Sequence, residues 1–261
     1  MSLPFSPPRN PAIMCGSFLT ARWTMIPLHD DNPTTINPVV TITLIVVCFL
    51  VFLWQQALPV HDQARVLAGL GVIPAVLLGG ASLPHEYALL PVGATLFTSM
   101  FLHAGWMHLI GNMLYLWIFG NNIEDAMGHV RFIVFYLLCG VLAGVAHAFS
   151  EIGSEIPTIG ASGAISGVLG AYLLLYPRAQ VMVAFPAFPL LWRPIYLPAV
   201  VVLGFWFLLQ VINSALDAGQ AGGVAWLAHV GGFVAGMLLI PLFKYSHVRF
   251  FHPAHHHDDW R

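Results

Sequence analysis

Ser162 and His229 are of the two residue types that most often supply a nucleophile and its base. Ser162 lies between glycines at the start of an apolar stretch, residues 160–176, and His229 lies within another apolar stretch. A serine hydroxyl becomes a good nucleophile only when an adjacent base takes its proton, and a neutral histidine is the usual base. The pair therefore predicts nucleophilic catalysis. The alternatives are an N-cap or packing role for Ser162 and a buried, carbonyl-bonded structural role for His229.

His108 and Asn112 could supply hydrogen bonds to a developing negative charge. They are four residues apart, so on a helix they share one face and both side chains can donate toward one point. An oxyanion hole requires such donors. An interhelical polar clamp would use the same spacing, which does not decide between the two. Ser162 at a helix start would add the positive end of the helix dipole, and Gly160 would let a substrate carbonyl come close to the backbone.

Other catalytic patterns are missing from the sequence. No Asp or Glu lies near these positions in the three stretches, so the residues form a dyad and not a triad. HExxH is absent, so a zinc protease has no visible ligand set. Ala164 after Gly163 breaks the GxSxG pattern of α/β-hydrolases. The His-rich tail, residues 255–259, could bind a metal, but a solvated tail is favoured. The sequence thus predicts no metal and no cofactor.

The composition is that of an integral membrane protein. Of the 261 residues, 58% are hydrophobic and only 8% are charged, against roughly a quarter charged in soluble domains. The formal net charge of −2 and the lack of a basic block argue against a nucleic-acid partner. The predicted surrounding is the lipid bilayer, in which polar side chains are costly and tend to mark function.

Six stretches are apolar enough for membrane-spanning helices, which need about 20 residues. They predict an all-α, polytopic bundle with helices at 39–57, 107–120, 132–149, 162–176, 195–213 and 224–243. The apolar segment 66–80 is interrupted by Gly69, Gly71 and Pro74 and is too short to cross. We therefore expect an interfacial or re-entrant segment in a membrane-associated first loop, residues 58–95. The alternative is a seventh helix.

The distribution of positive charge favours six helices over seven. With six helices, all basic residues except Arg65 fall on one side of the membrane, which puts both termini in the cytoplasm. Those residues are Arg9, Arg22, Arg131, Arg178, Arg193, Lys244, Arg249 and Arg261. His108, Ser162 and His229 then all lie just below the outer surface.

This topology also predicts the organisation of the chain. We expect a cytoplasmic segment at 1–38, a six-helix domain at 39–243 and a cytoplasmic tail at 244–261. The short N-terminal segment favours a bacterial plasma membrane, and an organelle membrane is the alternative.

Two of the predicted helices carry stripes of small residues, along which membrane helices approach closely. The stripes are Gly163, Gly167 and Gly170 on helix 162–176, and Ala225, Gly232 and Gly236 on helix 224–243. If the stripes pack together, Ser162 and His229 come within hydrogen-bonding distance.

Taken together, these residues resemble the rhomboid intramembrane serine proteases. The resemblance rests on HxxxN at His108 and Asn112, GxSG at 160–163, and AHxxGxxxG at 228–236. A further family pattern, thought to be structural, matches Gly120-x3-Glu124-x3-Gly128. The resemblance covers about residues 40–243, and the joint occurrence of the patterns in this order is highly specific.

The resemblance implies a serine endopeptidase that cleaves single-span membrane proteins in or beside their transmembrane segments. By position, Ser162 is the nucleophile and His229 the general base, while His108, Asn112 and the Ser162 backbone N–H stabilise the oxyanion. His103 resembles the family's supporting histidine in the first loop. Residues 217–223 would form a cap over a water-filled active site.

The sequence departs from the family at two places. Ala94-Thr95 stands where relatives have a Trp-Arg pair, and Ser166 stands where they often have an aromatic ring that packs on the catalytic histidine. Two other functions stay open. One is a non-catalytic rhomboid-like protein that binds transmembrane clients. A weaker one is a transporter that relays protons through His229 and His108, for which intramembrane carboxylates are lacking.

Overall fold

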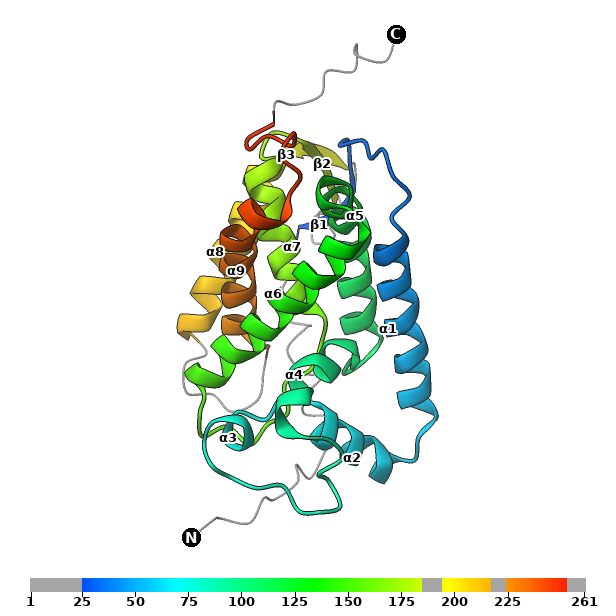
Figure 1. Ribbon diagram of the computed structural model, residues 1–261, viewed down its shortest axis with the longest axis vertical. Coiled ribbons are helices and arrows are strands. Elements are labelled where there is room, and N and C mark those ends of the chain that lie inside the picture. Colours follow the sequence, from blue (N-terminus) through cyan, green and yellow to red (C-terminus); the bar gives the residue numbers. More distant parts are fainter. Residues whose placement is uncertain (1–24, 185–193, 217–223, 253–261) are drawn as a thin grey trace.

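The computed structural model describes residues 25–184, 194–216 and 224–252. They form a bundle of helices with a small β-sheet at one end (Figure 1). The strands are β1 Ile26–Asp30, β2 Gln180–Ala184 and β3 Ile195–Pro198. The long helices are α1 Val39–Ala57, α5 Trp106–Met127, α6 His129–Ser150, α7 Ser162–Leu175, α8 Ala199–Leu216 and α9 Trp226–Phe243. Short helical segments lie between α1 and α5: α2 Val60–Leu70, α3 Pro74–Leu77, η2 Val92–Ala94, α4 Thr95–Thr98 and η3 Ser99–Phe101.

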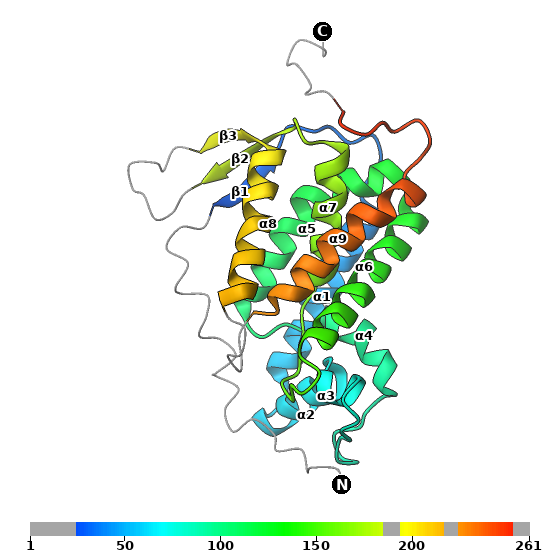
Figure 2. The same cartoon turned by 90° about the vertical axis from the view of Figure 1, so that its left-hand side faces the viewer.

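The long helices alternate in direction. α1, α6 and α8 run away from the sheet, and α5, α7 and α9 run back toward it (Figures 1 and 2). We call the end where α5, α7 and α9 begin the site end, and the end that carries β1–β3 the sheet end. His108, Ser162 and His229 lie in the first turns of α5, α7 and α9. All three residues are therefore at the site end.

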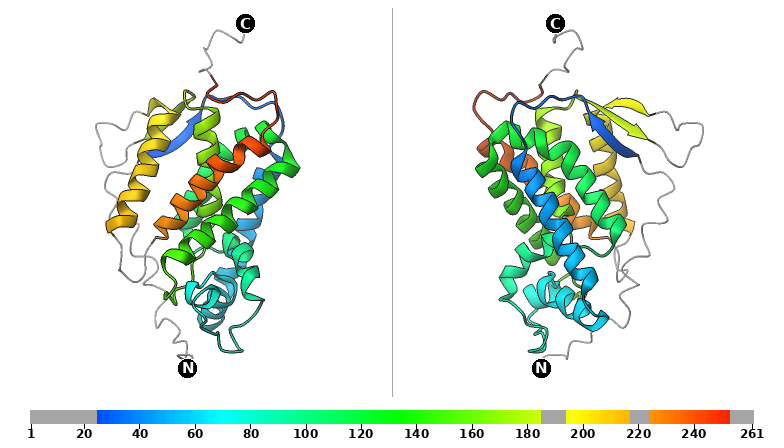
Figure 3. Two further views of the ribbon diagram at one scale, coloured as in Figure 1. Left: turned by 60° about the vertical axis from the view of Figure 1, so that its left-hand side comes forward. Right: turned by 90° about the vertical axis from the view of Figure 1, so that its right-hand side faces the viewer.

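Among the described residues, the helices α1, α6, α8 and α9 are long and apolar enough to cross a membrane by length and composition. α5 has 22 residues but ends in a mostly polar segment, residues 121–125. α7 has 14 residues, about 21 Å of helix at 1.5 Å per residue, which is less than the roughly 30 Å hydrocarbon core. α7 is the central element of the bundle. Eleven of its residues are buried, and α5, α6 and α9 pack around it, while α1 and α8 lie at opposite edges of the bundle (Figure 3).

Two of the predicted helix boundaries differ from the structure by four or more residues. α5 continues to Met127 and does not end at 120, because its polar C-terminal residues find partners in other elements. The helix predicted from 195 begins at Ala199, and Ile195–Pro198 is a strand. Proline disfavours helical backbone at the residue before it, here Leu197. Ile195 and Tyr196 are of residue types that favour strands. The all-α prediction therefore missed the sheet.

Glu124, near the end of α5, ties α5 to the first turn of α1. Its fully buried carboxylate accepts hydrogen bonds from the backbone N–H groups of Val40 and Thr41, both at 2.8 Å, and from the Thr41 hydroxyl at 2.7 Å. Nδ1 of His129 lies 2.6 Å from the same carboxylate. A carboxylate at a helix N-terminus satisfies free N–H groups and the helix dipole together. One turn before Glu124, Gly120 leaves room for Thr41, whose side chain would lie 3.2 Å from a Cβ atom at 120.

α7 and α9 are in backbone contact along their glycines, as the stripes of small residues predict. A Cβ atom on Gly232 would overlap the carbonyl oxygen of Gly163, and one on Gly236 would overlap that of Gly167. A Cβ atom on Gly170 would likewise overlap the carbonyl oxygen of Phe233. Only glycine permits this approach of two helices.

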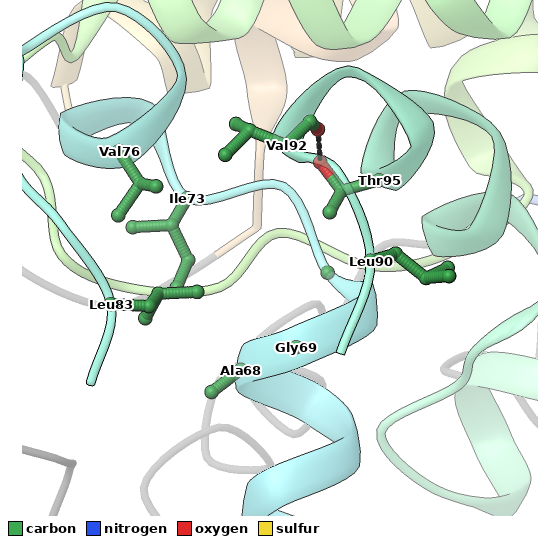
Figure 4. Close-up of a pocket in the computed structure, with 9 residues that line it drawn as sticks. Ala68, Gly69, Ile73, Val76, Leu83, Leu90, Val92 and Thr95 are labelled. Atoms are coloured by element: carbon green, nitrogen blue, oxygen red, sulfur yellow. Dashed lines mark hydrogen bonds between the residues drawn. The ribbon is translucent and has the colours of Figure 1, made fainter. Parts of the chain in front are cut away.

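The first loop folds at the site end around a small apolar cluster of its own. Ala68, Ile73 and Ala75 are buried there, away from the main core. α2 and α3 are separated by an extended segment in which Val72 pairs with Thr158, a residue of the loop before α7. At 11 and 4 residues neither helix is long enough to span a membrane, so the seventh helix is not observed. A small cavity lies between α2, α3 and the segment that leads to Thr95 (Figure 4).

The sheet joins segments that are far apart in the chain. β1 and β3 both pair antiparallel with β2, and the β1–β2 register is irregular between Pro27 and His29. Asp30 ends β1 and is buried, and it accepts a 2.6 Å hydrogen bond from the hydroxyl of Tyr172 on α7. Burial raises the pKa of Asp30 to about 6, with the Tyr172 hydrogen bond acting in the opposite direction.

Candidate active site

Ser162 and His229 are hydrogen-bonded to each other. Oγ of Ser162 lies 2.8 Å from Nε2 of His229. The contact follows from the fold, because Ser162 begins α7, His229 lies in the first turn of α9, and the two helices touch through glycines just beyond both residues. A neutral imidazole whose Nε2 carries no proton accepts this bond from the hydroxyl. That is the arrangement a serine nucleophile and its base require.

The loop before Ser162 is fixed by the first loop and by η3, which follows it. Gly160 donates its backbone N–H to the carbonyl of Ser99 at 2.9 Å, and Val72 and Thr158 exchange two backbone hydrogen bonds. Ala75 adds a bond from its N–H to the carbonyl of Ser154 at 2.9 Å. These contacts hold the backbone that enters α7, so the first loop positions Ser162 although it contributes neither member of the pair.

His108 lies against Gly160, two residues before Ser162. A Cβ atom at 160 would be 2.7 Å from Nε2 and Cε1 of His108, and Gly160 has a φ of +123°. Both the space and the backbone angle thus call for glycine. The backbone N–H of Ala104 donates to Nδ1 of His108 at 3.4 Å. In a neutral ring the proton is then on Nε2, which makes Nε2 a donor on the side of Gly160.

Asn112 provides a second donor near the same point. Its Nδ2 atom would lie 3.7 Å from a Cβ atom at 160. That nitrogen is buried and has no hydrogen-bond partner among the described residues. A buried amide donor without a partner is costly and calls for an explanation. An oxyanion bound beside Gly160 would provide the missing acceptor.

The ring of His229 is flanked by aromatic residues that sequence analysis did not consider. Trp206 on α8 lies with its ring centroid 5.9 Å away at 36°, and Trp226 on α9 lies 6.2 Å away at 86°. Ser166, which stands where relatives often have an aromatic ring, donates its hydroxyl to the carbonyl of Ser162 at 2.6 Å. The aromatic contact to His229 therefore comes from α8 and α9 and not from α7.

Gln210 is a site residue that sequence analysis missed. Its Oε1 lies 2.8 Å from Nδ1 of His229. The signal was present, because Gln210 is an amide side chain inside a mostly apolar predicted helix, and polar residues at membrane depth tend to mark function.

His103 lies beside the pair His108 and Gly160, not within bonding reach of Ser162. Its ring centroid is 5.2 Å from that of His108, and both of its buried ring nitrogens lack partners among the described residues. Gln55 of α1 holds the His103 backbone through Oε1, which accepts from the His103 N–H at 3.1 Å.

Ala94 and Thr95 stand where relatives have a Trp-Arg pair. Ala94 ends η2 and Thr95 begins α4, where the Thr95 hydroxyl donates to the Val92 carbonyl at 2.6 Å.

Two predicted features lie outside the described residues. They are the cap at 217–223 and the His-rich tail at 255–259. Within the described ranges, no group of three or more His, Cys, Asp or Glu side chains is arranged to hold a metal ion.

Fold and site together define a class: a helical integral membrane protein with a serine–histidine pair between two of its central helices. The family model described as the rhomboid domain matches residues 93–246, which is more than half of the chain. The chain therefore belongs to the rhomboid family.

Its relatives come from bacteria, plants and fungi. Rhomboid protease GluP of Bacillus subtilis is 36% identical over 146 residues, which cover 55% of this chain and 25% of GluP. RHOMBOID-like protein 5 of Arabidopsis thaliana is 29% identical over 61% of this chain and 49% of its own length. Rhomboid protein 1, mitochondrial, of Saccharomyces cerevisiae is 31% identical over 54% of this chain and 39% of its own length. The chain thus spans a quarter to about half the length of these curated relatives.

Proposed function

We propose that this chain is an intramembrane serine endopeptidase in which Ser162 is the nucleophile and His229 the general base. The observation that carries the proposal is the 2.8 Å hydrogen bond between Oγ of Ser162 and Nε2 of His229. The donors around Gly160 add to it. So does the name of the relative GluP, a rhomboid protease.

The reaction proceeds through an acyl-enzyme. Oγ of Ser162 attacks the scissile carbonyl carbon as its proton moves to Nε2 of His229, and the carbonyl π electrons move to oxygen. Collapse of the tetrahedral intermediate breaks the C–N bond, and His229 returns the proton to the leaving amine. Water, deprotonated by His229, then hydrolyses the ester by the same sequence of steps and regenerates Ser162.

In this reaction the negative charge on the tetrahedral oxygen would be stabilised by the donors around Gly160. Nε2 of His108 and Nδ2 of Asn112 both face Gly160, and the backbone N–H of Ser162 is at the start of α7, where helix N–H groups have no acceptor within the helix. Donors fixed in advance stabilise the charge without reorganisation, and one such donor is worth roughly 10²- to 10³-fold in rate.

The chain crosses the membrane six times in this proposal, through α1, α5, α6, α7, α8 and α9. Of the described basic residues that flank these helices, Arg131, Arg178, Lys244 and Arg249 are at the sheet end, and only Arg65 is at the site end. The positive-inside rule then puts the sheet end in the cytoplasm. Both termini would be cytoplasmic, with segments 1–38 and 244–261 flanking the domain 39–243, and a bacterial plasma membrane is the favoured location.

The substrates in this proposal are single-span membrane proteins, which reach the pair from within the bilayer. Rhomboid proteins act on transmembrane substrates within the lipid bilayer. The site end is where Ser162 lies, so cleavage would occur near the outer end of the substrate helix.

A fluorophosphonate probe tests the nucleophile. Purified protein in detergent should be labelled, and Ser162→Ala should abolish labelling. Ser166→Ala is the matched control, because Ser166 lies one turn along the same helix and spends its hydroxyl on a backbone carbonyl. Labelling that persists in Ser162→Ala would refute the assignment.

Cleavage of a single-span test substrate separates a protease from a client-binding protein or a transporter. We expect cleavage by the wild type and its loss in His229→Ala, by about 10⁴-fold or more. Binding of the substrate without cleavage by the wild type would favour the non-catalytic alternative.

A further inference from the structure

His229 is held at both ring nitrogens, and the second contact comes from α8. Nδ1 of His229 lies 2.8 Å from Oε1 of Gln210, which is 6% exposed. The four buried residues of α8 are Ala199, Val202, Leu203 and Gln210. Gln210 is thus the one polar side chain that this mostly apolar helix buries among its described residues, and it is directed at His229.

The orientation of the Gln210 amide is determined by its other end. Nε2 of Gln210 donates to the backbone carbonyl of Trp206, one turn earlier on α8, at 3.1 Å. The reversed amide would set Oε1 against that carbonyl oxygen, with two acceptors and no proton between them. Oε1 therefore faces His229. Because Oε1 can only accept, Nδ1 of His229 carries the proton.

A proton on Nδ1 decides what the other nitrogen can do. A neutral imidazole has one protonated and one bare nitrogen, so Nε2 is bare and accepts from the Ser162 hydroxyl at 2.8 Å. The other tautomer would put an N–H on Nε2, and His229 could then not take the proton of Ser162. Trp206, on the same face of α8 as Gln210, lies beside the ring and limits its rotation.

We propose that Gln210 is a positioning residue that holds His229 in the Nδ1–H tautomer and so keeps Nε2 free to act as the base. The inference rests on the proposed function of Ser162 and His229. Gln210 takes the position that a carboxylate occupies in a Ser-His-Asp triad. A neutral amide fixes the ring without placing a charge in an apolar helix, where an ionised carboxylate would be costly.

The tautomer of His229 can be measured without any assay of activity. In protein with ¹⁵N-labelled histidine, we expect Nδ1 of His229 to give the signal of a protonated nitrogen and Nε2 that of a bare nitrogen. The His229 signals are identified by their loss in His229→Phe. A wild-type protein with the proton on Nε2 would overturn the proposal, whether or not the protein is a protease.

Variants at 210 link the tautomer to the rate. Gln210→Leu and Gln210→Met remove the acceptor and keep an apolar chain of similar size. Each should mix the two tautomers and lower kcat about 10- to 100-fold, with little change in KM. The loss should be smaller than the ~10⁴-fold caused by a fixed wrong tautomer, because a free ring still visits the competent one. Gln210→Glu keeps an oxygen acceptor and should restore more activity than either.

Leu208→Ala on the lipid-facing side of α8, where Leu208 is 52% exposed, is the matched control and should leave the tautomer and kcat unchanged. Unchanged kcat and unchanged ¹⁵N signals in folded Gln210→Leu or Gln210→Met would refute the proposal. Failure of the proposed function looks different: the wild type would neither cleave nor be labelled, while the tautomer would still depend on Gln210.

Discussion

Gly160 is the residue at which the proposed oxyanion donors His108 and Asn112 and the proposed nucleophile Ser162 come together. Its φ of +123° is one that residues with a side chain rarely adopt, and the ring of His108 fills the space where a Cβ atom would be. The two requirements act on different things. The angle affects the stability of the loop, whereas the space affects the position of an oxyanion donor.

Gly160→Ala should therefore lose activity as well as stability. A displacement of His108 by about 1 Å is enough to cost roughly 100-fold in kcat, while a residue with a side chain at this φ costs about 1–3 kcal/mol of stability. Cleavage of the test substrate and thermal unfolding in detergent measure the two effects.

Gly80→Ala separates the causes. Gly80 also has a positive φ, of +76°, but nothing lies within 4 Å of a Cβ atom there. It should show the loss in stability and keep its activity. Equal loss of activity in both variants would mean that backbone strain, and not contact with His108, is responsible.

Which site residues the sequence could predict depended on whether they carry a local pattern. Ser162, His229, His108 and Asn112 lie in short motifs at helix starts, and the structure brings all four side chains to the region of Gly160 and Ser162. Gln210 carries no such motif. α8 carries apolar residues on all sides, since much of it faces outward, so its hydrophobic pattern does not indicate which face meets the bundle.

At the scale of elements, the pairing of α7 with α9 sets the distance between Ser162 and His229. The two helices touch through backbone atoms at Gly232 and Gly236, so there are no flexible side chains between them that could adjust. A change in their spacing is passed directly to the hydrogen bond of the pair.

Gly236→Ala should be strongly destabilising because its methyl group would overlap the carbonyl of Gly167. Overpacking of this kind costs about 1–3 kcal/mol, and we expect a lower midpoint of thermal unfolding together with reduced cleavage. Gly204→Ala is the control, since Gly204 lies in α8 with nothing within 4 Å of a Cβ atom. It should unfold at the same temperature as the wild type or slightly above it. A stable Gly236→Ala would show that α7 and α9 can move apart freely.

The helices were predictable and the sheet was not, because the strands pair with partners far away in the sequence. Each long helix forms hydrogen bonds within a single apolar stretch, so the local composition is sufficient to find it. β1 and β2 have five residues each and pair Ile26 with Ala184, across most of the chain. No local pattern reports such a partner, and strands this short show little alternation.

At the scale of the whole molecule, Asp30 and Tyr172 join the sheet to the central helix. The sheet would otherwise meet the bundle only through its connections and the packing of buried residues such as Val181 and Val183. A buried carboxyl at this junction makes its stability dependent on pH.

Asp30 has a pKa raised by burial from 3.8 to about 6. Its folded form therefore binds a proton more tightly than the unfolded form, so its contribution to stability is fully present below about pH 4. That contribution is lost as the pH rises through about 6. Asp30→Asn keeps an acceptor for the Tyr172 hydroxyl and removes the ionisation. Its stability relative to the wild type should rise by about 1–2 kcal/mol between pH 5 and pH 7.

Tyr172→Phe provides an independent check. The Tyr172 hydrogen bond lowers the pKa of Asp30, so its removal should move the pH dependence of unfolding to higher pH. Unfolding midpoints in detergent across pH 4 to 8 would measure both variants. Parallel curves for the wild type and Asp30→Asn would exclude Asp30 as the group responsible.

In the proposed reaction, the length of α7 has a consequence for water, the second reactant of hydrolysis. At about 21 Å, α7 is shorter than the roughly 30 Å hydrocarbon core by about 9 Å. Lipid does not compensate for the difference by thinning around α7, because the neighbouring helices enclose it. Ser162 is the first residue of this short helix. If the sheet end of α7 lies level with the inner surface of the core, water has about 9 Å to travel from the opposite surface to the acyl-enzyme, and a chain of three or four hydrogen-bonded molecules would cover that distance.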